Sequence, residues 1–422
     1  MHIKCKRSTE NVMYIQGSLI LASITQVIVG CTGLVGFLMN FVGPLTIAPT
    51  ISLIGLSLTG VVSEFCDPHW GISMLTAALI LLFSVYVNKI KIPLPAFNKK
   101  EKCHTTKFPI FQLFPVLLSV GIVWLLCYIL TIADVFPNDA NQKAYKARTD
   151  SKLNVVIQFG PPTFSAGVYV GMLAATISSI LESVGDYFAS ARLSDVAPPP
   201  PHALNRGIVM EGIASICSGI AGAGHATTTY SNNIGMIGIT KVASRAVFTT
   251  AAVILIICGV IGKFGAILAL IPQPIIGGTL LIGLSMVVSV GISVLQFSDM
   301  ASMRNITVLG VSFLAGLMIP EWIAAHSKDI DTGNEDLNQV IQVLLGTASF
   351  TGGLIGFLLD NTVPGTIEER GIKKWRFIPE KKIPIKDNKD LKIYEIPFVT
   401  KYLHNTVCSY VPFSPVFDVE IY

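Results

Sequence analysis

Ten apolar stretches dominate this chain, and they limit its fold more than any other feature does. A helix that crosses a lipid bilayer needs about 20 mostly apolar residues. Because every backbone N–H and C=O group must find a partner inside lipid, such stretches form helices. We therefore predict an all-α polytopic membrane protein, with spans at Val12–Leu38, Phe41–Val62, Trp70–Val87, Pro109–Ile132, Thr163–Ala191, Gly207–Ala223, Val247–Ile261, Ala266–Val290, Ile306–Ile319 and Val340–Leu359.

The composition supports this class and excludes others. Hydrophobic residues make up 51% of the chain and charged residues 13%, whereas a soluble domain carries about 25% charged residues. The basic residues lie in a few loops and form no stripe, so nucleic acid is not an expected partner. The eight cysteines show no metal-ligand spacing, and the chain has no Walker, GxSxG or HExxH motif. We predict no enzymatic activity and no cofactor.

Charged residues interrupt the apolar pattern between Leu181 and Arg245. Glu182 and Asp186 lie four residues apart, so they share one face of the helix predicted over Thr163–Ala191. A charge inside a bilayer costs on the order of 2.5–3.5 kcal/mol on insertion scales, and binding of a cation or a polar substrate would offset that cost. In the alternative interpretation, the lipid core ends near Leu181 and both acids lie in the cytoplasmic interface.

A third acid, Glu211, follows Arg206 and lies in the first turns of the span Gly207–Ala223. One interpretation is an acid that the positive end of the helix dipole favours. The other is a carboxylate near Asp186 that braces a site or binds an ion. The residues alone leave both open.

A passage rich in glycine, hydroxyl and amide side chains follows, from Gly222 to Lys241. Its β-branched residues at 227–229 favour an extended backbone. The short apolar stretch Asn232–Thr240 cannot cross a membrane alone, so we predict a half-helix whose free N–H groups point at a polar ligand. The predicted substrate contacts from this passage are Thr229, Tyr230, Asn232 and Asn233.

Loop charges predict the orientation, because lysine and arginine concentrate on the cytoplasmic side. The lysine-rich loop Asn88–Phe108 and the tail after Asp360 are expected to be cytoplasmic, whereas the acidic loops Ser63–His69 and Glu321–Asn338 are expected outside. This orientation leaves the basic residues among the first eleven outside, against the rule. We therefore expect further chain upstream.

Several separate segments resemble the nucleobase–ascorbate transporter family, and most closely its animal branch of sodium-dependent vitamin C transporters. The family signature falls on Asn232, Asn233, Gly235, Thr240 and Lys241. Other matching segments are Asn40–Thr46, Ser52–Ser57, His69–Ser73, Val123–Tyr128, Glu182–Tyr187, Pro198–Gly207, Leu295–Phe297 and Asp360–Gly365. The resemblance covers nearly the whole chain.

This resemblance implies fourteen helices in two inverted repeats of seven, divided into a core domain and a gate domain. Substrate would lie between two half-helices of the core, and an elevator-like movement would carry it across. Glu182 would bind the substrate together with Asn233 and the residue before it, while Asp186, with Glu211, would hold the coupling ion. The resemblance also implies sodium as that ion, ascorbate or a nucleobase as substrate, a plasma-membrane location and a possible homodimer.

Two departures from the family pattern bear on these expectations. Asn232 stands where vitamin C transporters have proline and many nucleobase carriers have glutamine or glutamate, so the substrate stays open. The first three helices of the family have no counterpart, so we expect about 11 of the 14 segments and, as an alternative function, a truncated non-transporting membrane protein or assembly partner. The predicted parts are an N-terminal stub (1–11), a core-domain helix (12–39), gate-domain helices (40–132), an external loop (133–162), the core domain with the substrate and ion site (163–262), further gate-domain helices (263–359) and a cytoplasmic tail (360–422).

Overall fold

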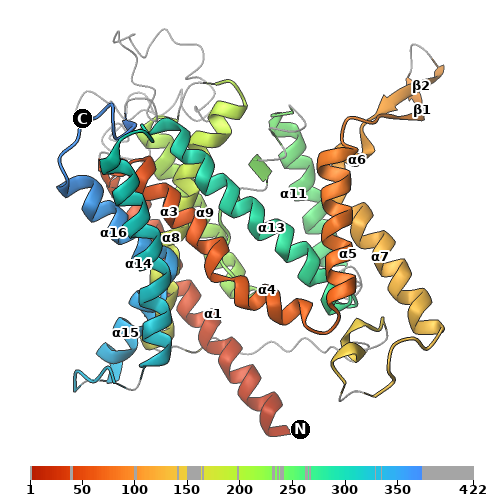
Figure 1. The fold of residues 1–422 in the computed structure, drawn as a ribbon, viewed down its shortest axis with the longest axis horizontal. Helices are drawn as coiled ribbons and strands as arrows, with labels where there is room; N and C mark the ends of the chain where they lie inside the picture. Colours follow the sequence, from red (N-terminus) through yellow and green to blue (C-terminus); the bar gives the residue numbers. More distant parts are fainter. Residues whose placement is uncertain are drawn as a thin grey trace. The chain divides into compact units, whose positions relative to one another are not determined.

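The chain is mostly helical in the computed structural model (Figure 1). The structure describes residues 2–38, 41–98, 102–139, 142–149, 163, 166–196, 199–230, 233–234, 237, 242–261, 265, 268–327, 329–333 and 335–372. Its helices are α1 (His2–Cys31), α2 (Leu34–Leu38), α3 (Pro44–Ser57), α4 (Thr59–Cys66), α5 (Trp70–Leu81), η1 (Leu82–Tyr86), α6 (Ile110–Leu113), α7 (Pro115–Ile132), η2 (Lys143–Ala147), α8 (Ala166–Leu193), α9 (Pro201–Ile220), α11 (Arg245–Val260), α13 (Gln273–Val294), η3 (Leu295–Phe297), α14 (Met303–Ala325), α15 (Glu335–Gly346) and α16 (Ala348–Thr362).

Two compact units divide the chain. The first comprises Met1–Ser57, Gln158–Ile234 and Val287–Tyr422, and the second comprises Leu58–Ile157 and Gly235–Met286. All the described candidate site residues from Glu182 to Asn233 therefore belong to the first unit.

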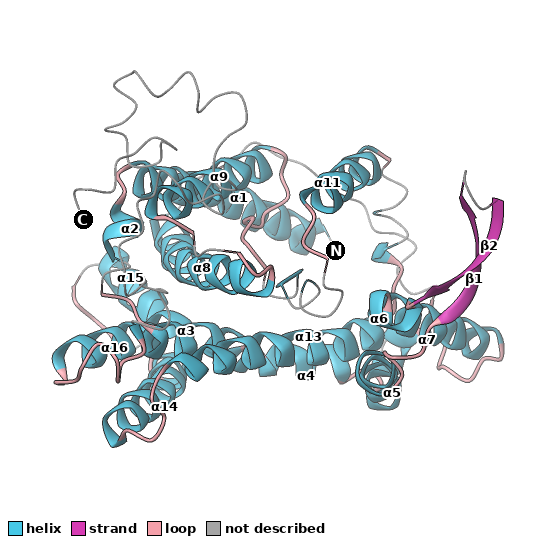
Figure 2. Cartoon of the chain, turned by 90° about the horizontal axis from the view of Figure 1, so that it is seen from above, coloured by secondary structure: helices cyan, strands magenta, loops and turns pink. Residues whose placement is uncertain are grey.

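The first unit contains two groups of helices. One group holds α1, α2, α8 and α9, and the other holds α3, α14, α15 and α16. Figure 2 shows α1, α8 and α9 together in one layer, with α3, α14 and α16 in another. Helix α8 also contacts α3, α15 and α16, so it lies at the boundary between the two groups.

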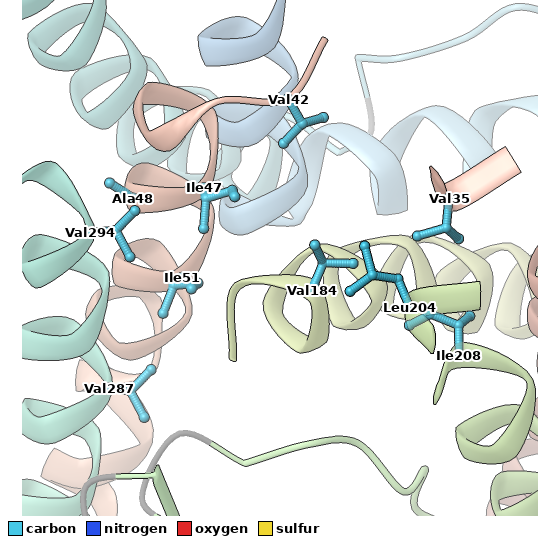
Figure 3. Packing of buried hydrophobic residues seen from close by; sticks show 10 residues of the cluster. All are labelled: Val35, Val42, Ile47, Ala48, Ile51, Val184, Leu204, Ile208, Val287 and Val294. Atoms are coloured by element: carbon cyan, nitrogen blue, oxygen red, sulfur yellow. The ribbon is translucent and has the colours of Figure 1, made fainter. Parts of the chain in front are cut away.

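Aliphatic side chains from both groups form the core of the first unit (Figure 3). Ile47 and Ile51 of α3 are fully buried in the same cluster as Val184 of α8 and Ile208 of α9. The full cluster is Val35, Val42, Ile47, Ala48, Ile51, Val184, Leu204, Ile208, Val287 and Val294.

Glycines allow α1 and α9 to approach closely. A Cβ atom at Gly212 of α9 would lie 2.7 Å from Val27 Cγ2, and one at Gly30 of α1 would lie 2.7 Å from Val209 Cγ2. Small residues at a helix contact are typical of helices that pack inside membranes. Here they join the helix that carries Glu211 to α1.

Six helices are long and apolar enough to cross a membrane, or seven if the bent pair of α15 and α16 counts as one span, among the residues that the structure describes. These six lie at Met13–Cys31, Pro44–Cys66, Pro115–Ile132, Gly167–Ala191, Gln273–Phe297 and Met303–Ala325. The predicted spans at Trp70–Val87 and Val247–Ile261 correspond to shorter apolar helices. The described residues thus confirm a polytopic arrangement, whereas the count of eleven segments stays a prediction.

The predicted span Val340–Leu359 corresponds to a pair of helices that bends by 77° between Gly346 and Ala348. Thr347 has an extended backbone there, with φ −92° and ψ 105°. The Thr347 hydroxyl donates to the carbonyl of Val343 at 2.8 Å, and the Thr351 hydroxyl donates to the carbonyl of Leu345 at 3.1 Å. These hydroxyls satisfy carbonyls that the break exposes, as a break in an apolar environment requires.

A hairpin corrects the all-α prediction in the second unit. Strands β1 (Ile92–Asn98) and β2 (Lys102–Phe108) pair antiparallel, with Ile92 opposite Phe108. The sequence analysis treated this stretch as a basic loop, but Thr105, Thr106 and Phe108 are good strand formers. The prolines of β1 are tolerated because both strands of a two-stranded sheet are edge strands.

The second unit also packs part of the predicted external loop. Phe136 and Ala147 join Ile72, Val123 and Ile275 in its apolar core. Arg148, only 5% exposed, donates to the carbonyl of Phe136 at 3.1 Å. The described part of 133–149 therefore packs into the core of the second unit, whereas its polarity indicated an ordinary external connection.

A buried ion cluster joins α14, the end of α16 and the segment that follows. Asp360 is 1% exposed and accepts hydrogen bonds from Arg304 at 2.8 Å and from Arg370 at 2.9 and 3.0 Å. Glu369 accepts from the hydroxyl of Ser302, the N-cap residue of α14. The first part of the predicted tail, up to Ile372, thus packs on α14, and the rest lies outside the described residues.

Candidate functional site

Helix α8 places the two predicted acids inside the protein. Glu182 is 7% exposed and Asp186 is 0% exposed. A buried carboxylate is costly without partners, and Asp186 does have interactions with its surroundings. Both acids are thus buried within the protein, and the two interpretations of their depth in the membrane stay open.

Side chains of α8 point to two different sides. On one side, the Ser178 hydroxyl lies 3.2 Å from the Ser349 hydroxyl of α16. A Cβ at Gly185 would lie 3.2 Å from Ile47 of α3. Ser178, Glu182 and Gly185 follow the spacing of one helix face, which we call the Glu182 face. It is directed at the boundary between the two helix groups.

The second side of α8, the Tyr187 face, consists of Ser179, Ser183 and Tyr187 at four-residue spacing. Ser183 donates to Glu211 Oε2 at 2.8 Å, and the Tyr187 hydroxyl donates to Glu211 Oε1 at 2.6 Å. Ser179 donates to the hydroxyl of Thr228 at 2.8 Å. This row of hydroxyls therefore binds both α9 and the segment that follows α9.

Glu211 connects three parts of the site. Besides Ser183 and Tyr187, its Oε1 atom accepts from the backbone N–H of Thr229 at 3.2 Å and from the Thr229 hydroxyl. Hydrogen bonds to a charged acceptor are stronger than neutral ones. Of the two interpretations that the sequence left open, this geometry favours a carboxylate that braces the site over one that is held only by a helix dipole.

The segment after α9 has no helix between residues 223 and 230, in agreement with the predicted extended stretch. Its backbone is held by side chains: the Thr227 N–H donates to Ser215 Oγ at 2.9 Å, and the Thr227 hydroxyl donates to the Glu211 carbonyl at 3.1 Å. Side chains of α9 thus replace the ladder that a strand in a sheet would have.

A helical conformation resumes at Asn233, whose N–H donates to the Tyr230 carbonyl at 2.9 Å. Ile234 and Ile237 are also helical and buried. The described residues of the predicted half-helix, Asn233, Ile234 and Ile237, are therefore helical, whereas its first residue lies outside the described part of the chain. Four residues of the predicted site lie outside the described residues, namely Asn232, Gly235, Thr240 and Lys241.

The structure brings most of the described candidates together. Glu182 and Asp186 lie buried on the same helix as Ser183 and Tyr187, both of which bind Glu211, and Glu211 binds Thr229. The sequence analysis missed Ser183, Tyr187 and Ser215. The i, i+4, i+8 spacing of Ser179, Ser183 and Tyr187 was a signal for the first two, because hydroxyls on one face of an apolar helix need partners.

The chain is similar in sequence to known membrane transporters. Residues 3–325 match the Permease family. Human Solute carrier family 23 member 2 is 44% identical over 429 residues, covering 97% of this chain and 65% of that protein. Mouse Solute carrier family 23 member 1 is 41% identical over 96% of this chain and 68% of its own length. Nucleobase-ascorbate transporter 1 of Arabidopsis thaliana is 34% identical over 91% of this chain and 74% of its own length.

Proposed function

Because the chain belongs to the nucleobase–ascorbate transporters of the Permease family, we propose that it is a secondary active carrier for ascorbate or a nucleobase. The chain spans 65% of the length of the human relative. The proposed transport activity therefore refers to the whole protein that the gene encodes. The proposal places it in the plasma membrane as a multi-pass protein, with a homodimer as its assembly.

Glu182 is the proposed substrate-binding carboxylate. Its face of α8 is directed at α3 and α16, whereas Ser183 next to it binds Glu211. A polar substrate at the boundary between the helix groups would accept or donate hydrogen bonds there with little competition from water. Tyr230 and Asn233, joined by a hydrogen bond from the Asn233 N–H to the Tyr230 carbonyl, complete the proposed contacts together with Asn232 of the family signature.

Asp186 is the proposed carboxylate for the coupling ion, which we take to be sodium. It lies one turn after Glu182 and is fully buried, so a bound cation would offset the cost of its charge. Glu211 has donors on both carboxylate oxygens, which favours a bracing role for it beside the ion site. No cofactor enters the proposal.

One observation carries this proposal above the others. Two buried carboxylates lie one turn apart on a membrane-length helix, beside a non-helical hydroxyl-rich segment that Glu211 ties to the same helix. Ionisable side chains and irregular backbone at membrane depth are tolerated where they line a binding site. A passive pore would instead show rings of like charge along a channel.

Uptake of labelled ascorbate, uracil and xanthine by cells that express the gene, with and without sodium, tests the proposal. We expect sodium-dependent uptake of one of the three compounds. The absence of sodium-dependent uptake for all three, at verified surface expression, would contradict it.

The variant Glu182→Gln tests the substrate role directly, since it removes the charge and keeps the shape. We expect at least a tenfold loss of uptake, about 1.4 kcal/mol, at unchanged expression. Glu321→Gln, at an exposed position of α14, is the matched control and should transport normally. Near-normal uptake by Glu182→Gln would place Glu182 outside the substrate site.

A further inference from the structure

Tyr187 lies on α8, and its side chain reaches α9. Its hydroxyl donates a hydrogen bond of 2.6 Å to Glu211 Oε1. The ring carries this hydroxyl on a rigid side chain with few rotatable bonds. A donor held in this way fixes the acceptor more firmly than a flexible side chain would.

Tyr187 and Thr229 donate to the same carboxylate oxygen of Glu211. Glu211 Oε1 accepts from the Tyr187 hydroxyl and from both the N–H and the hydroxyl of Thr229. Ser183 binds the other oxygen, Oε2. Tyr187 therefore helps to set the position of Thr229 relative to α8 through this shared oxygen, alongside the bond of Ser183 to Oε2 and that of Ser179 to Thr228.

Gly207, one turn before Glu211 on α9, provides the space for the tyrosine ring. A Cβ atom at Gly207 would lie 2.6 Å from the Tyr187 hydroxyl oxygen and 2.8 Å from ring atoms Cε2 and Cζ. Real Cβ atoms do not approach other atoms so closely, so any side chain at 207 would displace the ring. The glycine and the tyrosine thus form a matched pair.

Thr229 also lies close in sequence to two proposed substrate contacts. It directly precedes Tyr230, whose carbonyl accepts the N–H of Asn233 at 2.9 Å. Asn233 is therefore four residues from an anchor that Tyr187 helps to hold, and a displacement of Thr229 would act on Tyr230 through the peptide bond that joins them.

We propose that Tyr187 is a positioning residue for substrate binding, which acts through Glu211 to fix Thr229 and the neighbouring Tyr230, with Gly207 as its required neighbour. Tyr187 binds Glu211 and lies on a different face of α8 from Glu182. Its role is therefore to position the binding segment and not to contact the substrate. This inference rests on the proposed transport function for its kinetic consequence but not for its structural one.

Tyr187→Phe, which removes only the hydroxyl, is the first test. We expect about tenfold faster hydrogen exchange at the Thr229 amide in the purified chain and about a tenfold higher KM for uptake, with Vmax within twofold. A tenfold change is what the loss of one hydrogen bond to a charged acceptor produces. Tyr128→Phe, at a position that is 53% exposed on α7, is the matched control and should change neither quantity.

Gly207→Ala provides the second test, because it should displace the same hydroxyl from a different helix. We expect the same rise in KM and in exchange rate as for Tyr187→Phe. In the Tyr187→Phe background, Gly207→Ala should add less than twofold, because the hydrogen bond is already lost. Gly310→Ala, where an added Cβ meets nothing within 4 Å, is the control for alanine in a membrane helix.

Four results separate the possibilities. Unchanged exchange and KM in Tyr187→Phe, or an equal effect of Gly207→Ala in both backgrounds, would overturn the positioning role. Faster exchange at Thr229 in a protein that shows no uptake would support the positioning role while the proposed transport function fails. A fall in Vmax at constant KM would also overturn the inference, since it would indicate damage to the transport step instead of binding.

Discussion

The side-chain amide of Asn361 donates a hydrogen bond to the backbone carbonyl of Phe41, 3.0 Å away and 320 positions earlier in the chain. The Asn361 side chain also accepts a bond from Arg370 at 2.9 Å. Next to it, Asp360 lies so close to Gly43 that an added Cβ would be 3.3 Å from its carboxylate. The end of α16 thus holds the segment that leads from α2 into α3.

Replacement of Asp360 by asparagine should destabilise the protein strongly. It leaves Arg304 and Arg370 with no carboxylate between them, and breaking a buried ion pair typically costs about 3–5 kcal/mol. Adding Arg370→Gln should recover part of this loss, since it removes one uncompensated charge. Thermal unfolding in detergent measures both, and a double variant less stable than Asp360→Asn alone would contradict the cluster.

Gly352→Ala should lower stability by about 1–3 kcal/mol, the usual cost of overpacking a core. The added Cβ would lie 2.1 Å from Leu53 Cδ1 and 3.0 Å from the Ser312 carbonyl. Gly283→Ala on α13 meets nothing within 4 Å and should be neutral or slightly stabilising. Equal melting temperatures for the two variants would mean that α16 does not pack on α3 and α14 as described.

Thr351→Val should destabilise the bend between α15 and α16 by about 1–2 kcal/mol, because it removes the hydroxyl that donates to the half-buried Leu345 carbonyl. Thr351 is 2% exposed. Thr362→Val is the control, since that hydroxyl is exposed and bonds the Leu358 carbonyl within its own helix. Unfolding of the two purified variants measures the difference in their stability. Equal stabilities would show that the Thr351 hydroxyl does not support the bend.

His202, at the start of α9 and before the predicted span, should make stability depend on pH. Burial, together with nearby Arg206, lowers the pKa of His202 to about 4. The unfolded histidine titrates near 6.5, so the unfolded state binds the proton first and stability falls as pH drops from about 6.5 towards 4.

The variant His202→Gln should weaken that dependence. We expect the melting temperature of the parent to fall more between pH 7.5 and pH 5 than that of the variant. Comparison of both proteins at pH 7.5 gives the part of the change that is independent of protonation. Parallel pH profiles would mean that His202 does not contribute.

The membrane class and the acid pair could be predicted from sequence, because both depend on local patterns. Hydropathy over about 20 residues identifies helices such as α8, and a four-residue spacing places Glu182 and Asp186 on one face. The extended segment after α9 could also be predicted from local sequence, since its β-branched threonines and its glycines have clear backbone preferences. These features need no knowledge of which helices meet.

The remaining features depend on contacts between distant residues. Arg304 and Asp360 are 56 positions apart, and no periodicity links them, so the packed segment after α16 was predicted as tail. The bend at Thr347 lies inside a stretch that is apolar on average, and average hydropathy cannot distinguish a straight helix from a broken one. Glu211 had two open interpretations because its donors come from α8 and from Thr229, neither adjacent to it in sequence.

The two faces of α8 restrict how that helix can change position. Rotation about its own axis would turn Ser183 and Tyr187 away from Glu211 as soon as Glu182 changed its surroundings, since all are fixed to one backbone. Translation along or across the membrane keeps these bonds only if α9 and residues 227–230 travel with it, and the glycine contacts at Gly30 and Gly212 bring α1 along. Any displacement of α8 that keeps these bonds therefore involves α1, α9 and residues 227–230 as well, and Glu182 lies on the face of α8 that is directed at α3 and α16.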